Sequence, residues 1–264
     1  MSRAGELHDP GRIEPCSKSR RALRERRPLR QLTLAFPNRW GGARANAGRK
    51  RGSRSNTPHR ARPVHRASEP VHVTLRARVA PLRSQFVFPT LRLALLRAAR
   101  GDPERFRVVH FSVQRDHVHL LVEASDARSL SSGMRGLAGR VARYVNDLLG
   151  RRGKFWADRW HGRALGSPRE VRSIMLYVLA NFRKHASCTV RAGIDPFSSG
   201  IWFDGWREWS PAAGVPPPLV EAAPWLRSFP AAKEEQTSLS SRTWLATHGW
   251  RRHSLLSIAE RTAR

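Results

Sequence analysis

The sequence predicts an α+β fold in which helices cover one antiparallel sheet. Three observations predict it. Short segments between Val71 and Leu165 alternate apolar and polar residues, which is typical of half-buried strands. Longer amphipathic segments with recognisable ends separate them, which is typical of helices. The 264 residues are 40% hydrophobic, which is enough for the core of one domain of ordinary size with extensions.

Four segments have the pattern of strands. Val71–Arg78 places valine and leucine on one face and His72, Thr74, Arg76 and Arg78 on the other. Phe106–Val113 is rich in β-branched and aromatic residues, and Val118–Glu123 follows it after the tight connection Gln114-Arg115-Asp116. These two segments therefore form a hairpin. Trp160–Leu165 is the fourth short strand.

Three segments have the pattern of helices. Thr90–Arg100 is stopped by a Gly-Asp-Pro sequence, and Ser129–Leu149 is amphipathic and ends at Gly150 as its C-cap. The third runs from Pro168 to about His185, and Ser167 and Glu170 form a capping box at its start. The first six elements follow the order of the split βαβ, ferredoxin-like arrangement, to which the last helix is added.

The chain divides into three regions by composition. Residues 1–66 hold 18 Lys and Arg against four Asp and Glu, with poor apolar periodicity, so we expect a basic, partly disordered arm that binds DNA. Within it, Arg49, Lys50 and Arg51 resemble short arms that lie in a DNA minor groove, although a solubilising tail fits as well. Residues 67–190 form the predicted domain. Residues 191–264 form a Pro- and Trp-rich C-terminal extension with a small helical part near its end.

The charge of the chain indicates a polyanionic partner. Forty-nine Lys and Arg stand against 20 Asp and Glu, which gives a net charge of +29. Two isolated cysteines, Cys16 and Cys188, exclude a disulfide scaffold and a four-cysteine zinc site. The sequence has no long apolar run and no apolar N-terminal segment, so we expect no membrane association. The expected location is cytoplasmic, at the bacterial nucleoid.

A pair of histidines begins the third strand. Side chains alternate along a strand, so His117 and His119 share one face, about 7 Å apart, while Val118 and Leu120 face the other way. Two imidazoles so placed can bind one divalent metal ion. The alternative is a pair of half-exposed histidines that only form hydrogen bonds. His110 on the preceding strand either joins this metal or is an ordinary strand histidine with its own hydrogen bond.

The two tyrosines differ in their helical position. Tyr144 falls within the apolar stripe of its helix, which predicts a core residue, whereas Tyr177 lies about 120° away from the stripe of the last helix. Asn181 and Lys184 share the flank of Tyr177, one and two turns further on. A phenol can be a nucleophile at phosphorus, an amide oxygen can bind a metal, and a lysine can stabilise phosphate charge. The alternative is a surface tyrosine with ordinary neighbours.

Together these segments resemble a known family. His117-Val118-His119 is similar to the HUH motif of single-strand DNA nucleases. The same strand, the Gly153-x-x-Trp156-x-x-Arg159 loop and the Tyr-x-x-x-Asn helix resemble the single-tyrosine transposases of insertion sequences and their relatives, the REP-associated tyrosine transposases. The resemblance covers about residues 70–190. Family members often have proline after this asparagine, but Phe182 follows it here, so we expect the helix to continue.

The resemblance implies a site and a reaction. His117, His119 and Asn181 would bind Mg²⁺ or Mn²⁺, and Tyr177 would attack a scissile phosphate in single-stranded DNA. The products would be a 5′-phosphotyrosyl enzyme and a free 3′-OH, and reversal with another 3′-OH would join strands. The implied activity is DNA transposition at hairpin-flanked sites, by a monomer or a homodimer.

Further residues are expected to hold the DNA. Lys154, Trp156 and Arg159 interleave cations and aromatic rings in a loop, which can hold phosphates while stacking unpaired bases, and Lys184 would add to them. The alternative for Trp156 is a place in the core. Two other functions fit part of the pattern: a non-catalytic DNA- or RNA-binding protein, and a zinc site on the two histidines. The zinc site is weaker because a structural zinc favours cysteine partners.

Overall fold

A computed structural model describes the chain over residues 64–79, 81–99, 101–180, 182, 193–210, 212, 214–215, 218–219 and 240–261. All of these belong to one compact unit, residues 53–264. Almost all of the predicted arm 1–66, with Arg49, Lys50 and Arg51, lies outside the described residues, and so do Asn181, Lys184 and both cysteines.

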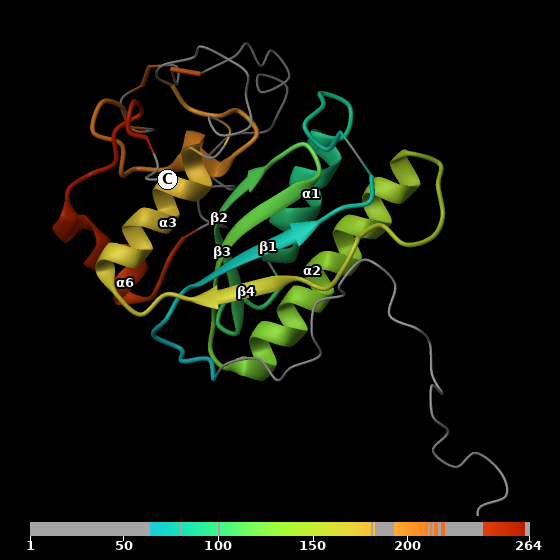
Figure 1. Cartoon of the computed structure of the whole chain (residues 1–264), viewed down its shortest axis with the longest axis horizontal. Coiled ribbons are helices and arrows are strands. Elements are labelled where there is room, and N and C mark those ends of the chain that lie inside the picture. The colour runs from blue at the N-terminus through green and yellow to red at the C-terminus, as the bar shows by residue number, and fades with distance from the viewer. Residues whose placement is uncertain are drawn as a thin grey trace, which may run out of the picture. The chain divides into compact units, whose positions relative to one another are not determined.

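The predicted fold is confirmed. The sheet order is β2-β3-β1-β4 and every pairing is antiparallel, as in a ferredoxin-like fold (Figure 1). The elements are, in chain order, β1 (Val71–Arg76), α1 (Phe88–Ala99), β2 (Phe106–Val113), β3 (His117–Ala124), α2 (Ala127–Leu148), β4 (His161–Ala164) and α3 (Pro168–Ala180). Three short helical segments follow: η1 (Ser199–Trp202), α6 (Trp244–Thr247) and η4 (Gly249–His253). The last two form the small helical part expected near the C-terminus.

The ends of α2 follow from local hydrogen bonds. The helix begins at Ala127, two residues before the predicted start, because the Asp126 carboxylate accepts the backbone N–H of Ser129 at 2.7 Å. Its other end is as predicted. Gly150 has a φ of +58°, and its N–H reaches the carbonyl of Asp147 at 3.1 Å. A residue without a Cβ is favoured at such a left-handed position.

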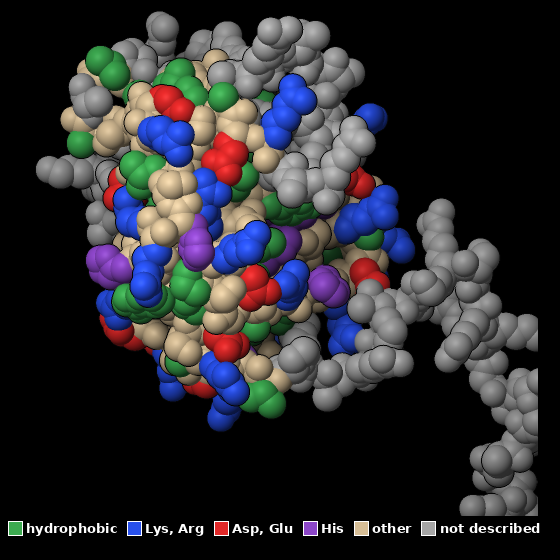
Figure 2. All heavy atoms as spheres, turned by 60° about the vertical axis from the view of Figure 1, so that its left-hand side comes forward, with side chains coloured by type: hydrophobic (Ala, Val, Ile, Leu, Met, Phe, Trp, Pro, Cys, Tyr) green, Lys and Arg blue, Asp and Glu red, His purple; other side chains and the backbone are tan. Residues whose placement is uncertain are grey.

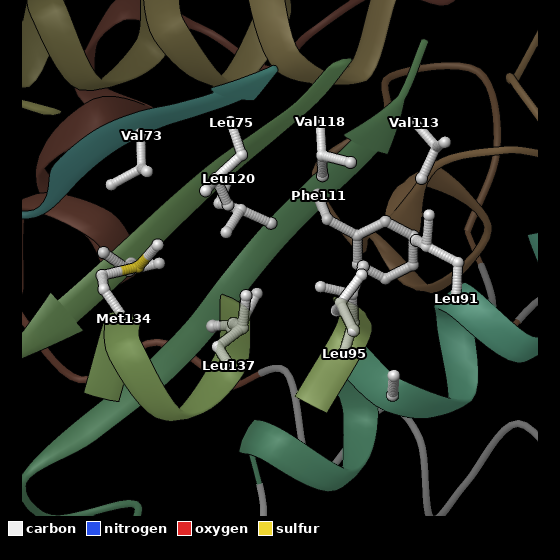
Figure 3. Packing of buried hydrophobic residues seen from close by; sticks show 14 of the residues in the cluster. Val73, Leu75, Leu91, Leu95, Phe111, Val113, Val118, Leu120, Met134 and Leu137 are labelled. Atoms are coloured by element: carbon white, nitrogen blue, oxygen red, sulfur yellow. The ribbon is translucent and has the colours of Figure 1, made fainter. Parts of the chain in front are cut away.

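One face of the sheet is covered by α1 and α2 and is apolar. Figure 3 shows side chains of β1, β2 and β3 pointing towards those of the two helices. The packed residues include Val73, Leu75, Phe111, Val113, Val118 and Leu120 from strands, and Leu91, Leu95, Met134 and Leu137 from helices. All of them are at most 1% exposed, so this layer is a closed hydrophobic core.

The opposite face is covered by α3, and the C-terminal extension packs against α3 in turn. Leu121 and Met175 share a second buried cluster with Trp206 and Trp250 of the extension. The buried face of α3 is therefore wider than the predicted stripe, since Leu176, Leu179 and Ala180 are also buried. Phe182 is helical and 5% exposed, in agreement with the expected continuation of the helix.

Ion pairs and hydrogen bonds fasten the extension to the domain. Arg172 of α3 donates to both carboxylate oxygens of Glu260, at 2.8 and 2.9 Å. Glu123 at the end of β3 accepts the backbone N–H groups of Arg242 and Thr243, just before α6. None of the helices in the described residues is long and apolar enough to cross a membrane.

Candidate active site

The two histidines of β3 share the face of the sheet that α3 covers, as predicted. The neighbouring Val118 and Leu120 lie in the core under α1 and α2. In the pairing of β1 with β3, Thr74 lies opposite His119 and Arg76 lies opposite His117. The two imidazole centroids are 4.7 Å apart. Figure 2 shows histidine side chains among Lys and Arg on one side of the molecule.

His119 lies in a buried environment. Its side chain belongs to a residue that is only 3% exposed. Its Nδ1 is 3.2 Å from Oγ1 of Thr74 and 3.3 Å from Nε2 of His72, both on β1. The rings of His72 and His119 stack, with centroids 5.3 Å apart and an angle of 25° between planes. The orientation of the His119 ring is therefore fixed by its neighbour strand.

His117 has a different partner. Its Nδ1 is 2.7 Å from Oδ1 of Asp116, and the other carboxylate oxygen of Asp116 accepts from Nε of Arg76 at 3.2 Å. The hydrogen bond with His117 is the main reason why the pKa of the Asp116 carboxyl is lowered. The carboxylate therefore stays ionised, and it holds the His117 ring through one nitrogen.

Tyr177 packs directly on the histidines. Its ring centroid is 5.0 Å from that of His119, with the planes at 75°, and 5.6 Å from that of His72, with the planes at 80°. The residue is half-buried, and its neighbours Met175 and Val178 are buried. Helix α3 thus places a phenol against the imidazoles of His119 and His72.

Tyr144 lies elsewhere. It belongs to α2, which covers the other face of the sheet, and it packs half-buried at the edge of that core. Its hydroxyl accepts a hydrogen bond from Arg97 at 3.0 Å, and this bond is the main reason why the pKa of the phenol is lowered. The structure therefore separates the two tyrosines, although Tyr144 is half-buried at the edge of the core and not inside it as predicted.

His72 and Thr74 are the site residues that sequence reasoning missed. The alternation of the first strand predicted that both lie on its polar face. Local sequence patterns did not indicate which strand pairs with it. The available signal was the antiparallel order β3-β1 of the expected fold, which brings the polar face of β1 next to the histidines. The pKa of His72 is lowered to about 4, first by burial and then by the nearby His161 and Arg163. This imidazole is therefore neutral at neutral pH.

The predicted DNA-binding loop lies beside the same end of the sheet. Phe155 is buried, whereas Trp156 is half-buried, and its indole N–H donates to the carbonyl of Ala138 at 2.9 Å. Lys154 and Arg159 are exposed. The N–H of Ala157 donates to the carbonyl of Arg76, which lies opposite His117. The loop thus presents cations near the His117 end of the site.

The histidine pair suits a divalent metal ion by its donor chemistry. Each ring uses Nδ1 in a hydrogen bond, so Nε2 is the atom that each could present to a metal. Among the described residues no cluster of three His, Cys, Asp or Glu side chains is arranged around a metal position. The predicted third donor, Asn181, is outside the described residues.

Comparisons with known proteins give a family match and similar solved structures. Residues 92–181 match a family model described as IS200-like transposase. A REP-associated tyrosine transposase bound to a REP hairpin is 20% identical, with a TM-score of 0.43 over 54% of this chain and 82% of the other. A protein assigned as a transposase from Deinococcus radiodurans R1 is 16% identical, with a TM-score of 0.33 over 50% of this chain and 97% of the other.

No curated protein matches the chain significantly. The family match spans His117, His119 and Tyr177 and ends at Asn181, so it contains all the predicted catalytic and metal-binding residues. The segment of this chain that carries the histidine pair and the tyrosine helix therefore matches the IS200-like transposases, and the resemblance predicted from its sequence is confirmed.

Proposed function

We propose that this chain is a transposase that cleaves and rejoins single-stranded DNA through Tyr177. The observation that carries the proposal is the packing of Tyr177 against His119, with ring centroids 5.0 Å apart. A tyrosine whose only role is packing has no need of two imidazoles, those of His119 and His72, against its ring. The IS200-like match over residues 92–181 supports the same reaction class.

The reaction is a pair of transesterifications. The Tyr177 oxygen forms a bond to the scissile phosphorus, and the bond from phosphorus to the 3′ oxygen of the preceding nucleotide breaks. The phenolic proton passes to solvent, and the leaving 3′ oxygen takes one up. Attack by a 3′-OH of another strand reverses these steps. No energy source is required, because the phosphotyrosine conserves the phosphodiester energy.

In this proposal His117, His119 and Asn181 hold Mg²⁺ or Mn²⁺. A divalent ion held there would supply Lewis-acid polarisation of a phosphate oxygen. The protein contributes the rest. The stacked His72 and the Thr74 hydroxyl hold the ring of His119, and the ionised Asp116 holds that of His117. Helix α3, packed between the sheet and the extension, fixes the phenol of Tyr177.

The DNA strand is proposed to lie over the basic side of this face. Lys154 and Arg159 are exposed near the His117 end, and Trp156 lies between them. Lys184 and the cations Arg49, Lys50 and Arg51 of the arm extend the binding surface in this proposal. Since the net charge is +29, affinity for DNA should fall steeply with salt. The natural substrate is proposed to be hairpin-flanked DNA of the bacterial cytoplasm.

The test is the formation of a covalent adduct. Full-length protein is mixed with labelled single-stranded hairpin DNA and Mn²⁺, and the bands that survive denaturation are compared. We expect an adduct for the wild type and for Tyr144→Phe, and its loss in Tyr177→Phe and His119→Ala. Tyr144→Phe is the matched control, because it removes the other phenol at a position on the far side of the sheet.

Two results would overturn the proposal. An adduct that persists in Tyr177→Phe but disappears in Tyr144→Phe would show that Tyr144, and not Tyr177, is the nucleophile. Tight DNA binding without an adduct, for a panel of hairpins and with folded protein, would instead support a non-catalytic nucleic-acid-binding protein.

A further inference from the structure

We propose that His72 and Thr74 are positioning residues for His119, and that they hold its imidazole as the Nδ1–H tautomer with Nε2 directed to the metal. The inference rests on the proposed metal role of His119. It concerns residues of β1 that contribute no metal ligand in the proposed function.

Geometry is the first reason. Two polar atoms converge on Nδ1 of His119: Oγ1 of Thr74 at 3.2 Å and Nε2 of His72 at 3.3 Å. Both can accept a hydrogen bond from one Nδ1–H group. The residue is 3% exposed, so solvent competes poorly for this nitrogen. A ring held in this way would have its lone pair on Nε2, and that is the form that binds a metal.

The second reason is the contrast with His117. That ring lies at the open end of the site and uses the carboxylate of Asp116 at 2.7 Å. The same carboxylate is bridged to the exposed Arg76, with its own side chain 37% exposed. A carboxylate beside the buried His119 would lose most of its hydration, which is costly. Two uncharged partners orient the buried ring without that cost.

Ring packing is the third reason. The His72 ring stacks on His119 with an angle of 25° between planes and meets the edge of Tyr177 at 80°. One side chain therefore touches both the proposed metal ligand and the proposed nucleophile. The register supports this placement, since Thr74 pairs directly with His119 across the sheet.

The first experiment needs neither DNA nor catalysis. Histidine ¹⁵N–¹H correlation spectra of the metal-free, full-length protein report the tautomer of each ring. We expect His119 as the Nδ1–H form in the wild type, and a mixture of tautomers in the double variant His72→Phe/Thr74→Val. The first change keeps an aromatic ring and the second keeps the branched side-chain shape, while both remove the acceptor. A wild-type spectrum with His119 as the Nε2–H form would overturn the inference.

The second experiment measures the affinity for Mn²⁺ by electron paramagnetic resonance, again without DNA. Loss of groups that orient a ligand typically lowers metal affinity by about 10- to 100-fold, and we expect a loss in this range for His72→Phe/Thr74→Val. The variant His72→Gln/Thr74→Val, which has an acceptor at position 72, should recover part of the lost Mn²⁺ affinity. His253→Phe is the matched control, because His253 is exposed at the end of η4.

The outcomes separate this inference from the proposed function. Unchanged Mn²⁺ affinity and an unchanged His119 tautomer in a folded double variant would refute the positioning role, even if Tyr177 forms an adduct. Conversely, the wild type could form no adduct while the double variant clearly loses Mn²⁺ affinity. That result would support the positioning role and contradict the proposed nuclease activity. Thermal unfolding of each variant shows that the protein measured is folded.

Discussion

The two faces of the sheet are built on different principles. The face under α1 and α2 is packed by aliphatic and aromatic side chains that exclude water. The face under α3 also holds a buried cluster, but histidines interrupt it, including His72, His110 and His119. Since buried imidazoles lose hydration, the second face is the less favourable one to fold. The difference indicates that one face supplies stability and the other supplies the site.

Two neighbouring residues of β3 allow the two faces to be compared directly. Leu120 and Leu121 are both fully buried, but Leu120 belongs to the cluster under α1 and α2 and Leu121 to the one that contains α3. They have the same chemistry, burial and strand. Only the face differs, so substitutions here isolate the role of each face.

The largest effect is expected from Leu120→Ala and Leu121→Ala. Each should lower the free energy of unfolding by about 2–5 kcal/mol, because each leaves a cavity in a packed cluster. Under conditions in which both variants remain folded, only Leu121→Ala should also slow adduct formation, since Leu121 packs in the cluster that holds the tyrosine helix. Denaturant titration measures the first quantity, and adduct formation over time measures the second.

Tyr144→Phe serves as the reference in the kinetic assay. An equal loss of rate in Leu120→Ala and Leu121→Ala would contradict the division of roles, because it would mean that the core under α1 and α2 shapes the site as much as the other cluster does.

Most of the scaffold was predictable from local signals. The β-branched and aromatic residues of Phe106–Val113 predicted the bounds of β2 without error, and the capping box at Ser167 predicted the start of α3. The off-stripe position of Tyr177 predicted a polar environment, and the tyrosine does contact two imidazoles. These features depend on residues close together in the chain, which is why periodicity and capping rules reveal them.

What was missed depends on distant contacts. The burial of Leu176 and Leu179 was not predicted, because nothing in α3 itself indicates that Trp250 and its neighbours pack in the same cluster. His72 joins His119 only through pairing across 47 positions of sequence. Strand register and the docking of a tail are decided by tertiary packing, and one sequence does not specify them.

A smaller effect is expected from pH. It tests how much a buried histidine on the face under α3 lowers the stability of the protein. Burial lowers the pKa of His110 from 6.5 to about 4, while its Nδ1 contacts Oγ of Ser199 at 3.2 Å. Between these pH values the unfolded chain binds more protons than the folded one, so stability falls as pH falls. Between pH 7 and pH 5 this histidine should lower the free energy of unfolding by about 2 kcal/mol.

The measurement compares the wild type with His110→Gln by denaturant titration at both pH values. Glutamine can keep a hydrogen bond to Ser199 but does not titrate, so the variant should lose about 2 kcal/mol less than the wild type on acidification. Identical pH dependence in the two proteins would show that the buried imidazole does not weaken this face in acid.

The smallest effect is expected at the start of α3, where the polar face begins. The hydroxyl of Ser167 accepts the N–H of Glu170 at 3.3 Å, and the Glu170 carboxylate accepts the N–H of Gly166 at 3.0 Å. Ser167→Ala should lower the free energy of unfolding by about 1 kcal/mol, because it leaves a helix N–H without its cap. Ser173→Ala, at an exposed position inside the same helix, should change it by less than about 0.5 kcal/mol. If the two variants were equally stable, the capping box would not hold the tyrosine helix, and the packing of α3 between sheet and extension would have to fix its start alone.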